Sequence, residues 1–139
     1  QWSEVGRHYG ASSTFCHFSL AMVEQCLRGE ELRARHQAAL LKLHKKALQE
    51  KARAELAWLS HQKRCLENLH DSKGASAMAT KQRQVLTELK QEQAEIQHLQ
   101  NIYKAAHQER KLILKQQRDI LMMQRSTAQL QEKLRNMTA

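Results

Sequence analysis

The sequence predicts an all-α fold of two long helices with a short break near residues 71–76, arranged as a helical hairpin or an extended coiled coil. The 139 residues contain no proline and only 4 glycines, a composition typical of long helices. Two Phe, two Tyr and two Trp are too few to fill the centre of a compact domain of this length. Turn-forming residues cluster only once in the interior of the chain, at 71–76. These observations argue against a deep-cored enzyme fold.

Residues 1–11 mix aromatic residues and glycines without a period, so we expect an irregular lead-in there. Gln1 in place of Met, and a last turn without a stop signal, indicate a piece of a longer chain. Ser12 or Ser13 is expected to cap the first long helix, because a hydroxyl oxygen there accepts an otherwise unpaired backbone N–H. This first helix is expected over residues 12–71.

Gly29 lies inside the first helix and marks either a kink or a boundary, since glycine costs about 1 kcal/mol relative to alanine there. Glu30 and Glu31, which favour helix, follow Gly29 directly, so we expect a continuous or mildly kinked helix. Apolar residues further along recur at helical spacing, with Trp58 and Leu59 as the expected packing anchor. This stripe runs through Leu41, Leu48, Ala52, Leu59, Leu66 and Leu69, and Leu40, Ala47, Ala54 and Trp58 widen it.

The turn is expected at residues 72–76, with Gly74 as a left-handed cap of the first helix and Ser76 as the cap of the second. Connections this short usually join antiparallel neighbours, so we favour the hairpin over the extended rod. The second helix is expected over residues 77–137.

Two neighbouring seven-residue rows are expected to form the packing face of the second helix. One row is Val85, Glu92, Leu99, Ala106, Ile113, Ile120, Thr127 and Leu134, and the other is Leu89, Ile96, Tyr103, Arg110, Gln117, Gln124 and Gln131. The polar residues Arg110, Gln117 and Gln124 either specify register or mark where self-pairing ends. The predicted packing seam therefore consists of Leu41, Leu48, Trp58, Leu59, Leu66, Leu89, Ile96, Leu99, Ile113 and Ile120.

A third row on the second helix is basic at six of its seven positions: Arg83, Lys90, Gln97, Lys104, Lys111, Arg118 and Arg125. Seven residues return to nearly the same angle of a helix, so this row is expected opposite the seam, facing away from it. The first helix carries a shorter version in Arg28, Arg35 and Lys42, with Lys45, Lys46 and Arg53 nearby. One interpretation is a solvated coiled-coil face that only keeps the rod soluble. The near absence of Asp and Glu from the row favours the other, a surface that binds an acidic partner.

The net charge of +9 also favours an acidic partner. We do not expect nucleic acid, because no zinc finger, aromatic stacking platform or basic-zipper layout accompanies the basic rows. We do not expect a membrane, because no run of 18 apolar residues exists and the apolar face lacks interfacial aromatics.

No catalytic, cofactor or metal site is expected. The chain has no glycine-rich phosphate loop and no nucleophile elbow. Cys16, Cys26 and Cys65 are widely spaced without a CxxC pair, which indicates free thiols in a reducing cytosol. His61 and Cys65 stand one turn apart, but further zinc ligands would have to come from distant segments.

Three short strings, ELRARHQ (31–37), AELAWL (54–59) and ERKLILKQQ (109–117), resemble the centrosome-associated protein 350 family, and more closely its coiled-coil-domain-containing paralogue. The resemblance covers roughly Ser19 to Leu134. It implies a non-enzymatic scaffold of the cytoplasmic cytoskeleton, at centrosomes, centrioles or the axoneme of cilia. The family's microtubule-binding CAP-Gly module is not part of this chain, so tubulin contact does not transfer from it.

The resulting hypothesis is docking on microtubules or acidic filament proteins through the basic rows. The alternative is an assembly module that binds other coiled-coil proteins through its apolar seam, without microtubule contact.

Overall fold

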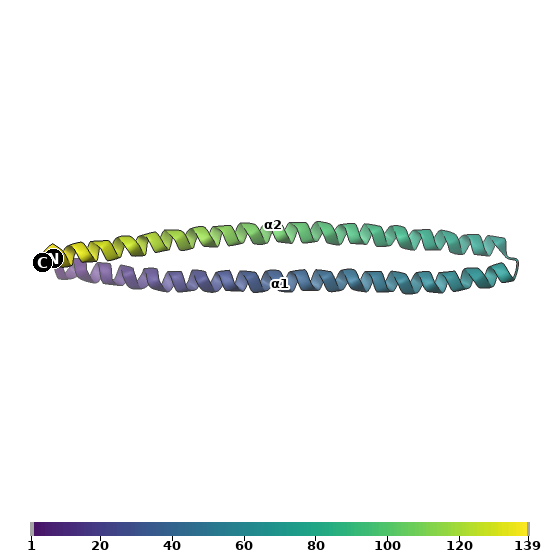
Figure 1. Cartoon of the computed structure of the whole chain (residues 1–139), viewed down its shortest axis with the longest axis horizontal. Helices are drawn as coiled ribbons and strands as arrows, with labels where there is room; N and C mark the ends of the chain where they lie inside the picture. The colour runs from purple at the N-terminus through teal and green to yellow at the C-terminus, as the bar shows by residue number, and fades with distance from the viewer. Residues whose placement is uncertain (1, 139) are drawn as a thin grey trace. The chain divides into compact units, whose positions relative to one another are not determined.

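The chain forms two helices, shown in a computed structural model that describes the backbone of residues 2–138 and the side chains of residues 14–138 (Figure 1). Helix α1 spans Trp2–Asn68 and helix α2 spans Ser72–Thr138, each of 67 residues. No strand occurs within residues 2–138. The predicted all-α class with two long helices is confirmed.

Helix α1 begins earlier than expected, at Trp2, where residues 1–11 had been expected to be irregular. Nothing in that segment forbids a helix, because it has no proline and each glycine costs only about 1 kcal/mol. The helix also passes through Gly29 without a break, as predicted. A Cβ at Gly29 would meet open space, so packing does not require glycine there.

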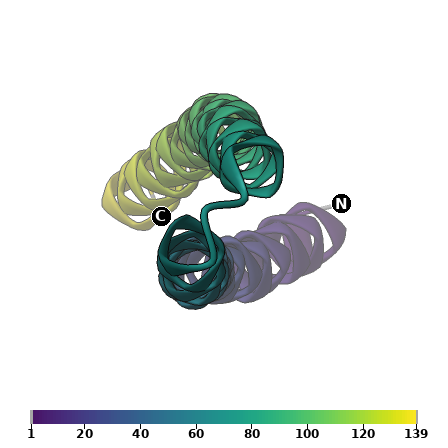
Figure 2. The same cartoon turned by 90° about the vertical axis from the view of Figure 1, so that its right-hand side faces the viewer.

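The chain reverses at residues 69–71 rather than 72–76 (Figure 2). His70 adopts the left-handed conformation, with φ of 61°. Its N–H donates to the carbonyl of Glu67 at 3.0 Å, and the N–H of Asp71 donates to the carbonyl of Leu66 at 2.9 Å. These two bonds close a helix end around a left-handed residue, a role that usually falls to glycine.

Asp71, and not Ser76, caps the start of α2. Its Oδ1 accepts the N–H of Gly74 at 2.9 Å, so α2 begins at Ser72, five residues before the predicted start. Gly74 is not left-handed. A Cβ on Gly74 would lie 2.6 Å from Oδ2 of Asp71, so glycine here leaves room for the capping carboxylate.

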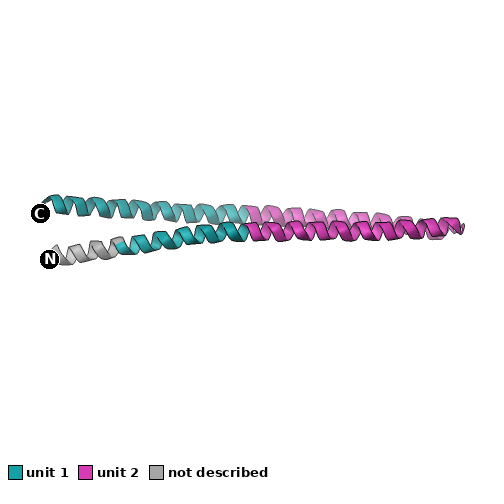
Figure 3. Ribbon diagram, turned by 60° about the horizontal axis from the view of Figure 1, so that its bottom comes forward, with its two compact units in different colours: residues 1–34, 105–139 teal, residues 35–104 magenta. Residues whose placement is uncertain are grey.

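The chain divides into two compact units, residues 1–34 with 105–139, and residues 35–104 (Figure 3). We call them the terminal unit and the turn unit. The turn unit is a helical hairpin, in which Gln82 Nε2 donates to Ser60 Oγ at 2.9 Å across the two helices. The terminal unit is also an antiparallel pair, since Cys16 lies beside Gln124. The predicted hairpin therefore holds within the turn unit.

Small and aliphatic side chains face inward in the turn unit. Ala52, Leu59, Ala75 and Ile96 are buried there. Leu41, Leu48, Leu66 and Leu89, all predicted for the packing seam, are half-buried. Alanine on both helices allows the two backbones to approach closely.

Four predicted seam residues are not packed between the helices: Trp58, Leu99, Ile113 and Ile120 are 58%, 38%, 48% and 56% exposed. Trp58 precedes the inward Leu59, which turns its ring to the flank of α1. The other three lie outside the interface because the inward residues of α2 do not recur at every seventh position. They run Val85, Leu89, Gln93, Ile96 and Gln100, with two successive steps of four. Such a step shifts a heptad seam by one position, so the row through Leu99 and Ile113 leaves the interface.

Candidate interaction surfaces

The basic row of α2 is divided between the two units. Arg83, Lys90 and Lys104 in the turn unit are exposed, as predicted for an outward ridge, and so are Arg28, Arg35 and Lys42 on α1. The later residues Lys111, Arg118 and Arg125 are half-buried in the terminal unit. The expectation that the whole row faces away from the seam is therefore wrong for these last three. The shift of the inward positions toward Leu114 and Leu121 turns them inward.

A charged cluster joins the two helices of the terminal unit around Glu30, whose side chain is only 2% exposed. Arg110 Nε lies 2.8 Å and His107 Nδ1 lies 3.1 Å from Glu30 Oε1. Arg33, one turn along α1, pairs with Oε2. Both carboxylate oxygens are therefore engaged, and every side-chain polar atom of the buried described residues has a partner.

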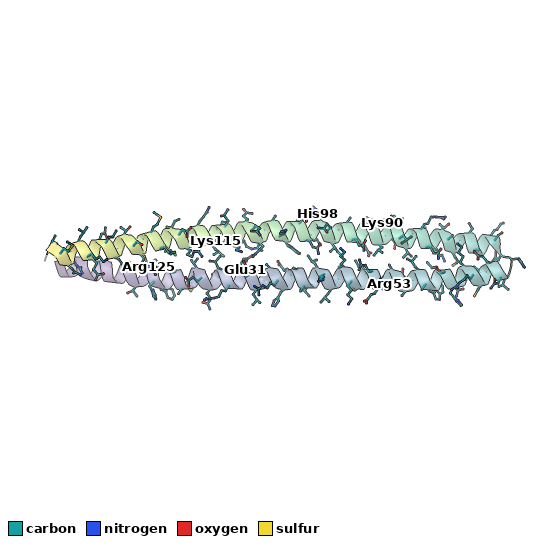
Figure 4. The ribbon with its side chains drawn as sticks, in the orientation of Figure 1. Glu31, Arg53, Lys90, His98, Lys115 and Arg125 are labelled. Atoms are coloured by element: carbon teal, nitrogen blue, oxygen red, sulfur yellow. The ribbon has the colours of Figure 1, made fainter. Side chains whose placement is uncertain are left out.

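Glu31 extends this cluster toward the surface. Lys111 Nζ lies 2.6 Å from Glu31 Oε1, and His107 Nε2 lies 3.7 Å from the same oxygen. Figure 4 shows Glu31 on the side of α1 that faces α2. The adjacent carboxylates of Glu30 and Glu31 on α1 thus bind three side chains of α2. These are His107, Arg110 and Lys111.

Burial of the Glu30 carboxylate by itself raises its pKa, because a charge is disfavoured away from water. The hydrogen bonds from Arg110 and His107, the charge of Arg110 and the bond from Arg33 outweigh burial and lower the pKa to about 2. The carboxylate is ionised and its acceptors are occupied, so the cluster fixes the pairing of the helices instead of offering an acid or base.

Only part of this cluster is predictable from the sequence. Arg110 stood among the polar residues that either specify register or mark the end of self-pairing, and its bond to Glu30 favours the first. Glu30 was interpreted only as a helix former after Gly29. A signal was present, because Glu30 lies seven residues after Val23 and seven before Gln37, and all three point inward.

The turn unit contains 13 Lys and Arg against 7 Asp and Glu. Across residues 35–104, all of which the structure describes, these side chains form no salt bridge. Its basic side chains are therefore not neutralised by an acidic side chain of the same unit.

Most of these basic side chains share one side of the hairpin. The residues are Arg35, Lys42, Lys46, Arg53 and Arg64 on α1, at steps of 7, 4, 7 and 11, and Arg83, Lys90 and Lys104 on α2. All eight are exposed, and we call them the basic face.

The basic face follows from where its residues stand beside the seam. Arg53 directly follows the inward Ala52 and Lys90 directly follows the inward Leu89. Because both helices are right-handed and run in opposite directions, residues that follow inward positions turn to the same side of the pair. Figure 4 shows Arg53 and Lys90 at the same level along the two helices.

The cysteines and histidines whose side chains are described, from Cys16 onward, do not gather into a ligand site. Cys16 is buried, with Sγ 4.0 Å from Gln124 Oε1, and Cys26 and Cys65 are exposed; all three are free thiols. Cys65 Sγ lies 3.7 Å from His61 Nε2. Among the described residues, no group of three or more metal-ligating side chains occurs. Neither helix, over its described part, has an apolar stretch long enough to cross a membrane.

Comparison with known proteins identifies a relative among centrosomal proteins. No family model matches the chain, and no solved structure matches it. Mouse Centrosome-associated protein 350 is 47% identical over 127 residues, which cover 91% of this chain and 4% of that protein. The chain thus spans a small fraction of the relative's length. The match supports the family resemblance of the sequence motifs, without distinguishing the paralogue: this chain is a partial homologue of centrosome-associated protein 350.

Proposed function

We propose that this chain is a scaffolding segment of a centrosomal or ciliary cytoskeletal protein that docks on microtubules, or on another acidic filament, through the basic face. The name of the mouse relative supports the centrosomal setting, and the three sequence strings point to the coiled-coil-domain-containing branch of that family. The proposal assigns no catalytic step to the chain.

The observation that carries the proposal is the set of eight exposed basic side chains on one side of the turn unit, none of them in a salt bridge. Unpaired charges of one sign create a field that attracts an oppositely charged surface. The tubulin surface and its tails are strongly acidic. A face that repeats along two helices suits a filament, whose own charges repeat along its axis.

The alternative function is capture of another coiled-coil protein through the apolar seam. In the turn unit the centre of that seam, including Leu59 and Ile96, is already buried between α1 and α2. A partner helix that used these residues would have to separate the pair.

The test is co-sedimentation of the chain with microtubules at low and moderate salt. Lys42→Glu, Lys46→Glu, Arg53→Glu and Lys90→Glu together reverse half of the basic face. We expect this variant to bind at least about fourfold more weakly, since each of the four exposed charge contacts contributes roughly 0.2–1 kcal/mol. Binding of the unchanged chain should weaken as salt rises, because salt screens exposed charges.

A matched control makes the same change in net charge away from the basic face, with Lys51→Glu, Lys73→Glu, Lys81→Glu and Lys115→Glu, all at exposed positions. We expect the control to lose much less binding. Equal losses in the two variants would mean that net charge, and not the basic face, drives pelleting. No pelleting of the unchanged chain at either salt would overturn the proposal.

A further inference from the structure

A groove lies along the turn unit between α1 and α2, away from the basic face. Its walls include Glu55 and Trp58 of α1 and Lys81 and Glu88 of α2, with Leu59 on its floor. Leu59 is buried, whereas the ring of Trp58 is 58% exposed. Trp58, Lys81 and Glu88 each directly precede an inward residue, so they turn to the side opposite the residues that follow one.

Apolar residues continue this side along α1. They are Leu40, Ala47, Ala54, Trp58 and Cys65, at steps of 7, 7, 4 and 7, and all are exposed. Steps of seven and four keep residues on one face of a helix and are the spacing of a helix-packing row. Helix α1 therefore has two apolar rows, one packed against α2 and one without a partner in residues 35–104.

Acidic residues continue the same side along α2. Glu92 and Glu95 follow Glu88 at steps of four and three, and the exposed Leu99 and Ile102 follow at further steps of four and three. With Glu55, four of the seven acidic residues of the turn unit lie on this side, against Lys51 and Lys81. Of these, Glu55, Glu88 and Lys81 line the groove itself. Within the described residues, none of these carboxylates forms a salt bridge. On a chain of net charge +9, the local excess is acidic here.

We propose that this side of the turn unit binds a basic amphipathic helix of another protein, which lays its apolar stripe over Trp58 and its Lys or Arg residues beside Glu88, Glu92 and Glu95. The product is a three-helix coiled coil. An apolar row with charged flanks is the arrangement by which helices select a partner of opposite charge.

Charge complementarity selects this occupant over a second copy of the chain. Two copies packed through this side would bring Glu88, Glu92 and Glu95 of both copies together, which like-charge repulsion disfavours. The basic face of a second copy offers charge but no apolar stripe to cover Trp58. The proposal uses the side opposite the filament-docking face, so it does not depend on microtubule binding.

The test titrates the full 139-residue chain into a labelled synthetic peptide of four heptads, with Leu at the two seam positions and Lys at the flanking positions. One control peptide replaces each Lys by Glu, and another has the same composition in scrambled order. Fluorescence anisotropy of the label measures binding. We expect binding of the Lys peptide that is at least about tenfold tighter than that of either control.

Variants of the chain locate the site. Trp58→Ala should weaken binding of the Lys peptide at least about tenfold, as expected for an aromatic anchor at the centre of an interface. Glu88→Lys with Glu92→Lys should weaken it too and should switch preference to the Glu peptide. Arg83→Ala with Lys90→Ala, on the basic face, is the matched control and should leave the affinity unchanged. Circular dichroism confirms that each variant remains helical.

Equal binding of the Lys and Glu peptides would overturn the proposal, and so would unchanged affinity in Trp58→Ala. Dimerisation of the chain that Trp58→Ala abolishes, measured by analytical ultracentrifugation, would also overturn it and assign the side to a second copy. If the unchanged chain binds the Lys peptide but does not pellet with microtubules, the filament-docking proposal is wrong and the helix-binding proposal is supported.

Discussion

The terminal unit and the turn unit consist of segments of the same two helices, yet they use their charges in opposite ways. In the terminal unit, Arg110 and Lys111 are tied to Glu30 and Glu31 across the helix pair. In the turn unit, no basic side chain is tied to an acid within residues 35–104, and eight of them share an exposed side. The sequence shows one periodic basic row through both units. Whether a basic residue pairs across the two helices or stays exposed depends on its position relative to the inward-facing residues of its helix.

The largest effect is expected from breaking the cluster of the terminal unit. Arg110→Leu leaves Glu30 buried without its arginine partner on α2, and we expect a loss of about 3 kcal/mol in the free energy of unfolding. Urea unfolding followed by circular dichroism measures this. Lys90→Leu, the matched change in the turn unit, should stay within about 0.5 kcal/mol. Equal effects would erase the distinction between the two units.

Acid should weaken the terminal unit through Glu30. The pKa of its carboxyl is lowered from 4.5 to about 2 in the folded chain, so the unfolded chain binds the proton first as pH falls. The stability that Glu30 contributes is present above about pH 4.5 and is lost as pH falls toward about 2. Unfolding free energies measured between pH 6 and pH 2 should show this loss. Glu30→Gln should remove that part of the pH dependence, and an unaltered curve would contradict the role of Glu30.

Asp71 is a charged residue of the turn unit that has a structural role, because its carboxylate caps the start of α2. Asp71→Ala removes the cap from the Gly74 N–H, and we expect a loss of about 1 kcal/mol in stability. Gly74→Ala should gain little or destabilise in the unchanged chain, because its Cβ meets the Asp71 carboxylate. In the Asp71→Ala background the same substitution should fare better, since alanine favours helix by up to about 1 kcal/mol. Additive effects in this double-mutant cycle would contradict the cap.

The overall class was predictable because composition and the absence of proline leave a long helix few alternatives. The turn begins three residues and ends five residues earlier than predicted, since its boundaries depend on the left-handed His70 and on the reach of the Asp71 carboxylate, which a search for glycine and serine does not find. Such local hydrogen bonds decide where a helix ends within a cluster of turn-forming residues.

The later seam was predicted wrongly for a different reason. The prediction placed an inward residue at every seventh position after Val85, as in a regular coiled coil. In the structure, the inward residues around Leu89 are instead separated by two successive steps of four. By Ile113 the extrapolated row is outside the interface, and Lys111 has turned toward Glu31. Pairing of Glu30 with Arg110 depends on the register of two segments 80 residues apart, which the periodicity of one helix does not supply.

Lysine footprinting tests the central claim most directly. Acylation of the free chain, followed by mass spectrometry, should modify Lys42, Lys46 and Lys90 quickly and Lys111 slowly, because the Lys111 ammonium is held by Glu31. Added microtubules should protect Lys42, Lys46 and Lys90 but leave the exposed Lys73 and Lys115 reactive. If Lys111 reacts as fast as Lys90, or if protection is uniform along the chain, the separation of structural from available charge is wrong.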